Sequence, residues 1–243
     1  MSHSSDHRCE SFITSTFLFK LIMKIFKLSH YLTNKTPLYG STPAMKSETF
    51  TDLTKGDSSN THIVQVHNHT GTHVDVAFHF RADGKKISDY PDQLWTFDRV
   101  MIADVPKLPD SMVSVDDIGR YESAIKNCDV LLIRTGHEKY RNDDPDTYRL
   151  HGPGIAPELA LRLRSHENLR AVGIDAISVT SFQHRQLGRE THRNFFSPEF
   201  PDNFMLIEDM HLAGIPDIDQ LIIEPYFWTG IDGSPVTILA TSK

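Results

Sequence analysis

The sequence predicts a mixed α/β domain with a strand-dominated core, and three observations support this fold class. Short runs rich in Val, Ile and Phe recur along the chain, bounded by Gly, Pro, Asp and Asn. Only two segments have clear helical features, so helices are expected between the strands rather than in place of them. The chain has 243 residues, 39% of them hydrophobic, which is enough to bury a core in one large domain.

The expected strands are 23–29, 61–69, 73–80, 99–105, 129–136, 170–178, 204–209, 220–228 and 236–242. A helix is expected over 114–126, because Ser114 is a suitable N-cap with Asp117 three residues on, and apolar residues follow at helical spacing. A second helix is expected over 156–166, where Pro157 takes the first helical position.

Composition limits the classes of partner and the compartment. The net charge is −7 and no run of Lys or Arg is long, so no nucleic-acid partner is expected. The two cysteines, Cys9 and Cys128, provide neither a disulfide framework nor a zinc-finger spacing. A reducing, cytoplasmic location is therefore predicted.

The first 22 residues are expected to be an extension of a domain that spans 23–243. The apolar patch over 12–28 contains Lys20, Lys24 and Lys27, so it is too charged to span a bilayer and no membrane association is expected. It also lacks the small-residue cleavage site of a secretory signal. Two interpretations stay open: Met23 is the original start, or the stretch forms a short helix on the domain or at a subunit interface.

The strongest anomaly is a histidine cluster in "HNHTGTHVDVAFHF", residues 67–80. In an extended chain alternate residues share a face, so a strand from His73 onwards would direct His73, Asp75 and His79 to the same side. Gly71 permits a sharp turn that would bring His69 back beside them. His62 and His67 are expected at the surface.

Imidazole and carboxylate together suit a divalent metal such as zinc, manganese or iron. A catalytic ion keeps one position open for water and lowers that water's pKa to about 7, and His79 could then shuttle a proton. The competing interpretation is a set of ordinary hydrogen-bonded histidines. Burying these groups unpaired would cost several kcal/mol, a cost that either metal coordination or an exposed strand face removes.

The string from His69 to His79 resembles the signature H-x-G-T-H-x-D-x-P-x-H, with Ala77 where the signature has proline. That signature belongs to the cyclase-like metal-dependent hydrolases, which include bacterial kynurenine formamidase and isatin hydrolase. The resemblance extends over roughly residues 24–241. It is carried by the segments 27–40, 131–140, 151–163, 172–179, 191–210 and 232–240.

The resemblance implies a single domain of the cyclase/kynurenine formamidase type, with layered β/β/α architecture, assembled as a homodimer or homotetramer. It implies one or two divalent ions per subunit, zinc first and manganese as the alternative. His79 would be the catalytic acid and base. The implied metal ligands are His69, His73 and Asp75 for one ion, with Asp75, His192 and Glu208 holding or sharing a second.

Two of these ligands have competitors nearby in the sequence. Glu208 is preferred to Glu199 and Asp209, because it ends an apolar run as a ligand at a strand end would. His192 is preferred to His184, because the Arg-Asn-Phe-Phe stretch that follows it matches the family better.

The resemblance also indicates the substrate. Tyr39 takes the position of a tryptophan that stacks on the substrate's ring in the family's formamidases, and tyrosine can stack as well. Hydrolysis of a small amide of the formamide or lactam type is expected, and its most specific version is an arylformamidase of tryptophan catabolism that converts N-formylkynurenine to kynurenine. The alternatives are a cyclase or dehydratase acting on a carbonyl compound and a catalytically silent protein that binds a metal or metabolite. Thr70 and Thr72 would orient the imidazoles or merely shape the turn.

Overall fold

The computed structural model describes residues 23–242, and the extension predicted for residues 1–22 lies outside them. Its main feature is a nine-stranded sheet with the order β5-β12-β13-β4-β11-β10-β8-β6, in which β1 also pairs with β13. The strands are β1 (Lys24–Lys27), β4 (His73–Asp75), β5 (Thr96–Phe97), β6 (Val100–Asp104), β8 (Val130–Arg134), β10 (Ala171–Ile174), β11 (Met205–Glu208), β12 (Gln220–Pro225) and β13 (Gly233–Ser242).

The sheet has a parallel half and an antiparallel half. Strands β6, β8, β10 and β11 run parallel, whereas β4 is antiparallel to both β11 and β13. Strand β13 is ten residues long, and it pairs with β4 at its start and with β12 and β1 further along. This sheet confirms the prediction of a mixed, strand-dominated α/β domain.

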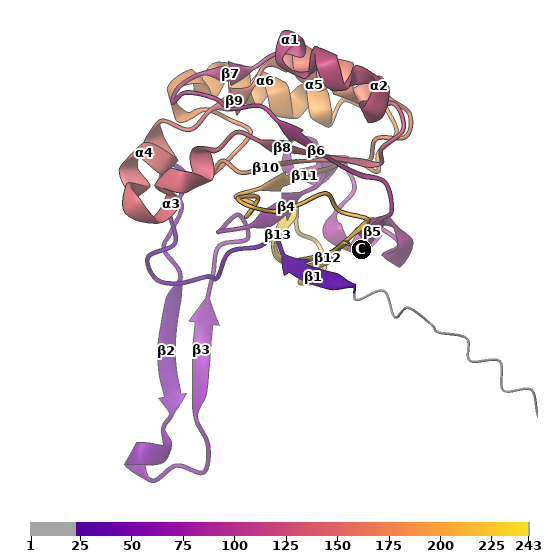
Figure 1. Ribbon diagram of the computed structural model, residues 1–243. Coiled ribbons are helices and arrows are strands. Elements are labelled where there is room, and N and C mark those ends of the chain that lie inside the picture. Colours follow the sequence, from indigo (N-terminus) through magenta and orange to yellow (C-terminus); the bar gives the residue numbers. More distant parts are fainter. Residues whose placement is uncertain (1–22, 243) are drawn as a thin grey trace, which may run out of the picture.

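Helices cover one face of the parallel half (Figure 1). They are α1 (Val115–Ile118), α2 (Glu122–Ile125), α5 (Pro157–Arg164) and α6 (Arg185–Phe195), with α3 (Tyr140–Asp143) and α4 (Pro145–Leu150) to one side. A small pair, β7 (Met112–Val113) and β9 (Gly154–Ile155), lies on the helical side. Within residues 23–242, no helix combines the length and the apolar character that crossing a membrane would require.

The predicted helix over 114–126 is interrupted. Ser114 and Asp117 form the expected capping box, but the turn Gly119–Tyr121 is a 3-10 helix that separates α1 from α2. The helix α6 was not predicted. Few of its residues are large and apolar, and its buried side consists of Gly188, Thr191, His192 and Phe195.

The strand predicted over 73–80 ends at Asp75, so that prediction is wrong for its second half. The segment Ala77–His79 is a 3-10 helix, closed by hydrogen bonds from the His79 N–H to the Val76 carbonyl (2.9 Å) and from the Phe80 N–H to the Ala77 carbonyl (3.2 Å). The physical reason is that the ladder ends after Val76, whose N–H donates to the carbonyl of Asp232, the residue before β13, while the N–H groups of His79 and Phe80 bond within the turn.

A two-stranded arm projects from the body of the domain (Figure 1). It consists of β2 (Lys46–Thr51), which was not predicted, and β3 (Thr61–Gln65), which is shorter than the run predicted there. Its apolar side chains Phe50, Ile63 and Val64 are between 56% and 70% exposed. The arm therefore contributes little to the core.

Two apolar layers pack against the sheet, and strand alternation assigns residues to them. In β8, Leu131 and Ile133 belong to the layer beneath the helices, whereas Val130 and Leu132 belong to the layer on the opposite face. In β4, Val74 lies in the opposite layer. Alternation therefore turns the residues on either side of it, His73 and Asp75, towards the helices.

Candidate active site

Four buried side chains meet where β4 and β11 face helix α6. In the antiparallel register Glu208 is opposite His73, so the two strands bring Asp75, His73 and Glu208 to one face. Helix α6 contributes His192 from above, and all four residues are at least 95% buried. The structure thus brings together ligand candidates that lie up to 135 positions apart in the sequence (208 − 73).

Each imidazole in this group faces both carboxylates at separations close to those between ligands of a cation. His73 Nε2 lies 3.4 Å from Asp75 Oδ1 and 3.4 Å from Glu208 Oε2. His192 Nε2 lies 3.8 Å from Asp75 Oδ2 and 3.6 Å from Glu208 Oε1. These distances exceed the usual N–H···O length of about 2.9 Å, and ligands at about 2.1 Å from a tetrahedral ion are about 3.4 Å apart.

The far ring nitrogens of the two imidazoles are anchored on backbone carbonyls. His73 Nδ1 lies 2.8 Å from the Gly71 carbonyl, and His192 Nδ1 lies 2.9 Å from the Gly188 carbonyl. A neutral imidazole that donates through Nδ1 presents its Nε2 lone pair to the carboxylates, which is the orientation that a metal ligand needs. The donor set therefore fits a divalent cation.

His69 reaches the same group through the predicted turn. Gly71 has φ +66, a conformation that favours glycine, and a Cβ there would also displace the end of the Leu32 side chain, whose Cδ2 would lie 2.3 Å away. His69 Nδ1 lies 2.8 Å from Asp75 Oδ1, and its Nε2 lies 3.0 Å from Asp232 Oδ2. Both ring nitrogens of His69 are thus hydrogen-bonded to carboxylates. One of these hydrogen bonds must break before that nitrogen can coordinate an ion.

Asp232 is a site residue that the sequence interpretation missed. Its Oδ2 lies 2.6 Å from His79 Nδ1, and its Oδ1 accepts a hydrogen bond from Asn68 Nδ2 at 2.8 Å. The signal in the sequence was the Asp-Gly pair that opens the final strand. The adjacent Gly233 pairs directly with Asp75 in the sheet.

Electrostatics keep the carboxylates ionised despite their burial. Burial alone would raise the pKa of Asp75, but the imidazoles around it outweigh that effect and hold the pKa well below its ordinary value. The same balance lowers the pKa of Glu208 to about 2. For Asp232, hydrogen bonds from His69 and His79 overcome burial and lower the pKa strongly.

The imidazoles carry the compensating charge. Burial would lower the pKa of His69, but Asp75 and Asp232 raise it to about 10. His192 responds in the same way to the carboxylates beside it, with a pKa of about 9, and the pKa of His73 is also raised. In the absence of an ion, protons therefore balance the negative charge of the cluster.

The competing residues lie elsewhere. Asp209 accepts two hydrogen bonds from the Arg141 guanidinium, at 2.7 and 2.6 Å, within a buried ion pair. Glu199 and His184 are exposed, and His62 lies at the surface as expected.

The threonines of the turn do not hydrogen-bond to the imidazoles. The Thr72 hydroxyl donates to the Asp209 carbonyl at 2.5 Å, and it also accepts the N–H of His30 at 2.9 Å. No partner is found for the buried Thr70 hydroxyl within residues 23–242. Thr72 therefore shapes the turn instead of orienting a ligand.

A cavity of about 500 Å³ opens above the cluster. Tyr39 lines it, as does Phe182, and their rings meet edge to face with centroids 5.7 Å apart. Burial, with a further effect of Glu208, raises the pKa of Tyr39 to about 12, so its hydroxyl stays neutral.

Arg185 and Arg189 also line the cavity, and the sequence interpretation missed both. His67, expected at the surface, is exposed at the rim of this cavity.

Comparison with known proteins identifies the family to which the chain belongs. Residues 26–181 match the family model described as "Putative cyclase". The chain belongs to the cyclase family. A protein of Bacillus cereus named kynurenine formamidase is 33% identical over 172 residues, which cover 69% of this chain and 73% of that protein. An uncharacterized protein of Haemophilus influenzae is 31% identical over 125 residues, covering 51% of this chain and 88% of its own.

Solved structures share the fold of this cyclase family member. Isatin hydrolase A from Labrenzia aggregata superimposes with a TM-score of 0.77 at 21% identity, covering 90% of this chain and 93% of that one. A predicted metal-dependent hydrolase from Bacillus stearothermophilus gives a TM-score of 0.71 at 22% identity, covering 91% and 99%. These structures share the fold, and the family resemblance detected in the sequence is confirmed by the family model and by the Bacillus cereus protein.

Proposed function

We propose that this cyclase family member is a metal-dependent hydrolase that cleaves a small amide bond. One observation carries the proposal: two buried imidazoles face two buried carboxylates at separations of 3.4 to 3.8 Å, at the floor of a cavity. The similarity to a protein named kynurenine formamidase supports the same reaction class.

The residues proposed to hold the metal are His73, Asp75, His192 and Glu208, joined by His69 when it releases a carboxylate. Zinc is the first candidate and manganese the second, because both accept imidazole with carboxylate. The two oxygens of Asp75 face different imidazoles, His73 and His192, so one bridging carboxylate could serve either one ion or two. When bound, the cation supplies activation of water and polarisation of the substrate carbonyl.

His79 is proposed to move the proton. Its Nδ1–H donates to Asp232, which fixes the tautomer and leaves Nε2 available for exchange. Its ring lies 4.2 Å from that of His69 and 5.9 Å from that of His192, centroid to centroid, so it stands beside the proposed ligands. From there it can protonate the nitrogen that leaves when the amide breaks.

The cavity favours an aromatic amide that carries a negative group. Tyr39, Phe80 and Phe182 provide ring surfaces, whereas Arg185 and Arg189 place positive charge in the lining. An arylformamidase acting on N-formylkynurenine fits this chemistry, since that substrate has both an aryl formamide and a carboxylate. Isatin, a neutral lactam, lacks the carboxylate.

The homodimer or homotetramer expected for the chain is proposed to form through the β2–β3 arm. A two-stranded hairpin alone is marginally stable in water, yet this arm extends from the domain with Phe50, Ile63 and Val64 exposed. Replacing Phe50 and Ile63 by glutamate should lower the molar mass measured by light scattering. An unchanged mass would exclude the arm as the contact. The cytoplasmic location and the domain boundary at residue 23 stay predictions.

The experiment that tests the reaction uses metal-stripped protein reloaded with Zn²⁺ or Mn²⁺. It should hydrolyse N-formylkynurenine faster than formanilide and faster than isatin, and water labelled with ¹⁸O should place its oxygen in the formate released. Asp75→Asn should lose both metal and turnover, whereas His79→Gln should keep metal and lose turnover. His184→Gln, a change at an exposed histidine, is the matched control. Turnover without incorporation of solvent oxygen would indicate a cyclase or dehydratase, and metal uptake without any turnover would indicate a binding protein.

A further inference from the structure

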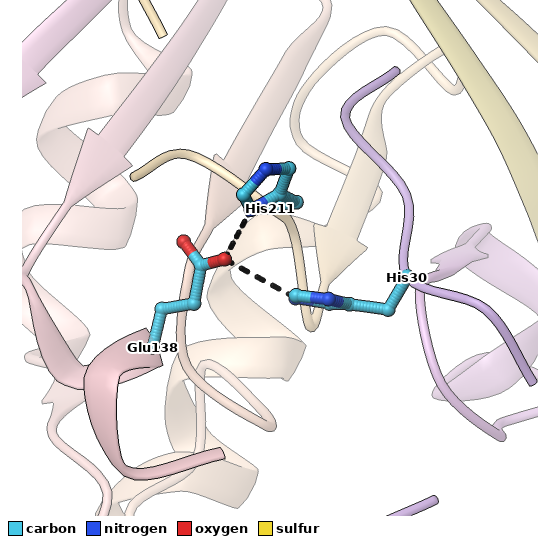
Figure 2. A group of neighbouring side chains, drawn as sticks. All are labelled: His30, Glu138 and His211. Atoms are coloured by element: carbon cyan, nitrogen blue, oxygen red, sulfur yellow. Dashed lines mark hydrogen bonds and ion pairs between the residues drawn. The ribbon is translucent and has the colours of Figure 1, made fainter. Parts of the chain in front are cut away.

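A second cluster of potential ligands lies outside the cavity just described. It joins His30, which follows β1, Glu138 in the turn after β8, and His211, which follows β11 (Figure 2). One ligand atom from each residue lies within 4.8 Å of the other two. Glu138 Oε1 lies 3.6 Å from His30 Nε2 and is hydrogen-bonded to His211 Nδ1.

The carboxylate of Glu138 is held in place by groups outside the cluster. Its Oε2 accepts the backbone N–H groups of Leu212 and Ala213, each at 2.8 Å. Its Oε1 is therefore turned towards the two imidazoles, as Figure 2 shows. The backbone N–H groups thus fix the Glu138 carboxylate through one oxygen, and its other oxygen is oriented to serve as a metal ligand.

The nearby imidazole of His30 is unsatisfied. Its Nε2 is buried and has no hydrogen-bond partner among residues 23–242, although a carboxylate oxygen is 3.6 Å away. Burial, which outweighs the carboxylates nearby, lowers the pKa of His30 and favours the neutral ring. A buried nitrogen without a partner is costly, and coordination of a cation would remove that cost.

We propose that His30, Glu138 and His211 form a separate site for a divalent cation of the zinc class. Two nitrogens and one carboxylate oxygen are a zinc ligand set, and the 3.6 Å separation is close to the ligand spacing of about 3.4 Å around a tetrahedral ion. On binding, the proton on His211 Nδ1 would move through solvent to the other nitrogen of the ring, which would free Nδ1 for the ion, and the contact between His211 and Glu138 would widen. The side chain of His211 is 40% exposed, so solvent supplies the fourth ligand and the entry path.

An ion at this site would join three segments that support the proposed active site. The His30 N–H donates to the Thr72 hydroxyl at 2.9 Å, and Thr72 precedes His73. The same hydroxyl donates to the carbonyl of Asp209, the residue after Glu208. The cation would therefore act as a structural brace behind the loops that carry two proposed ligands, and it would take no part in the reaction.

Metal counting on the full chain tests the proposal. Stripped protein is titrated with Co²⁺, followed by its visible absorption, and with Zn²⁺, followed by calorimetry. His211→Ala and His30→Ala should each bind one equivalent fewer than the unaltered chain. Glu138→Gln should lose the same equivalent while its amide oxygen still caps Leu212, so the metal-free protein keeps its melting temperature. His151→Ala, a change at a half-exposed histidine paired with a single acid, should leave the count unchanged.

The two metal proposals can fail separately. In an Asp75→Asn background the active-site ions are removed, and one equivalent that depends on His211 should remain and raise the melting temperature. If the count is the same with and without His211 and His30, the cluster is only a hydrogen bond between Glu138 and His211, and the proposed site is wrong. That result would leave hydrolysis at the cavity unaffected.

Discussion

Gly233 is the position where a single methyl group should disable the proposed site. A Cβ built there lies 2.7 Å from His69 Cε1, 2.9 Å from the Val74 carbonyl oxygen and 3.1 Å from Asp75 Oδ1. Ordinary contacts are about 3.5 to 4.0 Å, so the neighbours must retreat by roughly 1 Å. The Val74 oxygen belongs to the backbone of β4, and moving it displaces the strand that carries Asp75.

The expected size of the effect follows from that displacement. Overpacking of this kind costs about 1–3 kcal/mol of folding free energy, and a shift of about 1 Å in a catalytic group costs on the order of 100-fold in rate. Gly233→Ala should therefore reduce kcat/KM for an aryl formamide about 100-fold and weaken metal binding, while urea unfolding shows a folded protein. The matched control is Gly119→Ala, where the backbone is helical (φ −52, ψ −38) and no atom lies within 4 Å of the new Cβ. If Gly233→Ala retained full turnover and metal affinity, the packing described for the site would be wrong.

Three other predictions test the surroundings of the site. Asp232→Asn should lower kcat about 10- to 100-fold with little change in metal content, because His79 loses the carboxylate that orients it; an unchanged kcat and pH profile would exclude that role. Arg141→Ala should reduce the free energy of unfolding by about 3–5 kcal/mol, measured by urea denaturation, because it leaves the buried Asp209 carboxylate unpaired; a loss below 1 kcal/mol would contradict this. The pKa of His192 is raised to about 9 in the folded protein, above its unfolded value of about 6.5, so the stability it contributes is complete below pH 6.5 and is lost as pH rises through 9. Metal-free protein should therefore unfold at lower urea at pH 9.5 than at pH 6.5, and equal midpoints would contradict the raised pKa.

The part of the site that could be predicted from the sequence is the part that local geometry determines. Period-2 alternation places His73 and Asp75 on one face, and a glycine with positive φ returns His69 to them. His79 reaches the cluster by a different route, since a 3-10 turn, rather than strand alternation, carries it there. That turn depends on Val76 bonding to the carbonyl of Asp232, a contact that no local pattern contains.

The elements missed have physical causes of the same kind. Helix α6 was missed because its buried side consists mainly of small and polar residues such as Gly188 and Thr191, with Phe195 as the large apolar residue among them. Gly188 has to be small, because a Cβ there would lie 2.2 Å from Thr180 Cγ2. Strand β2 was missed because its side chains are almost entirely exposed and show no buried face.

The carboxylates of the proposed active site can be buried because their negative charge is balanced either by protons on the imidazoles or by a metal cation. Two buried ionised carboxylates, of Asp75 and Glu208, with the partly exposed Asp232 nearby, would be prohibitively costly without positive charge. In the metal-free chain protonated imidazoles supply that charge, which is why the pKa of His69 rises to about 10. A divalent ion supplies the same charge and requires neutral imidazoles as ligands, so its uptake must expel those protons. The affinity for zinc should consequently increase as pH rises from 6 to 8, with proton release detectable in weakly buffered solution.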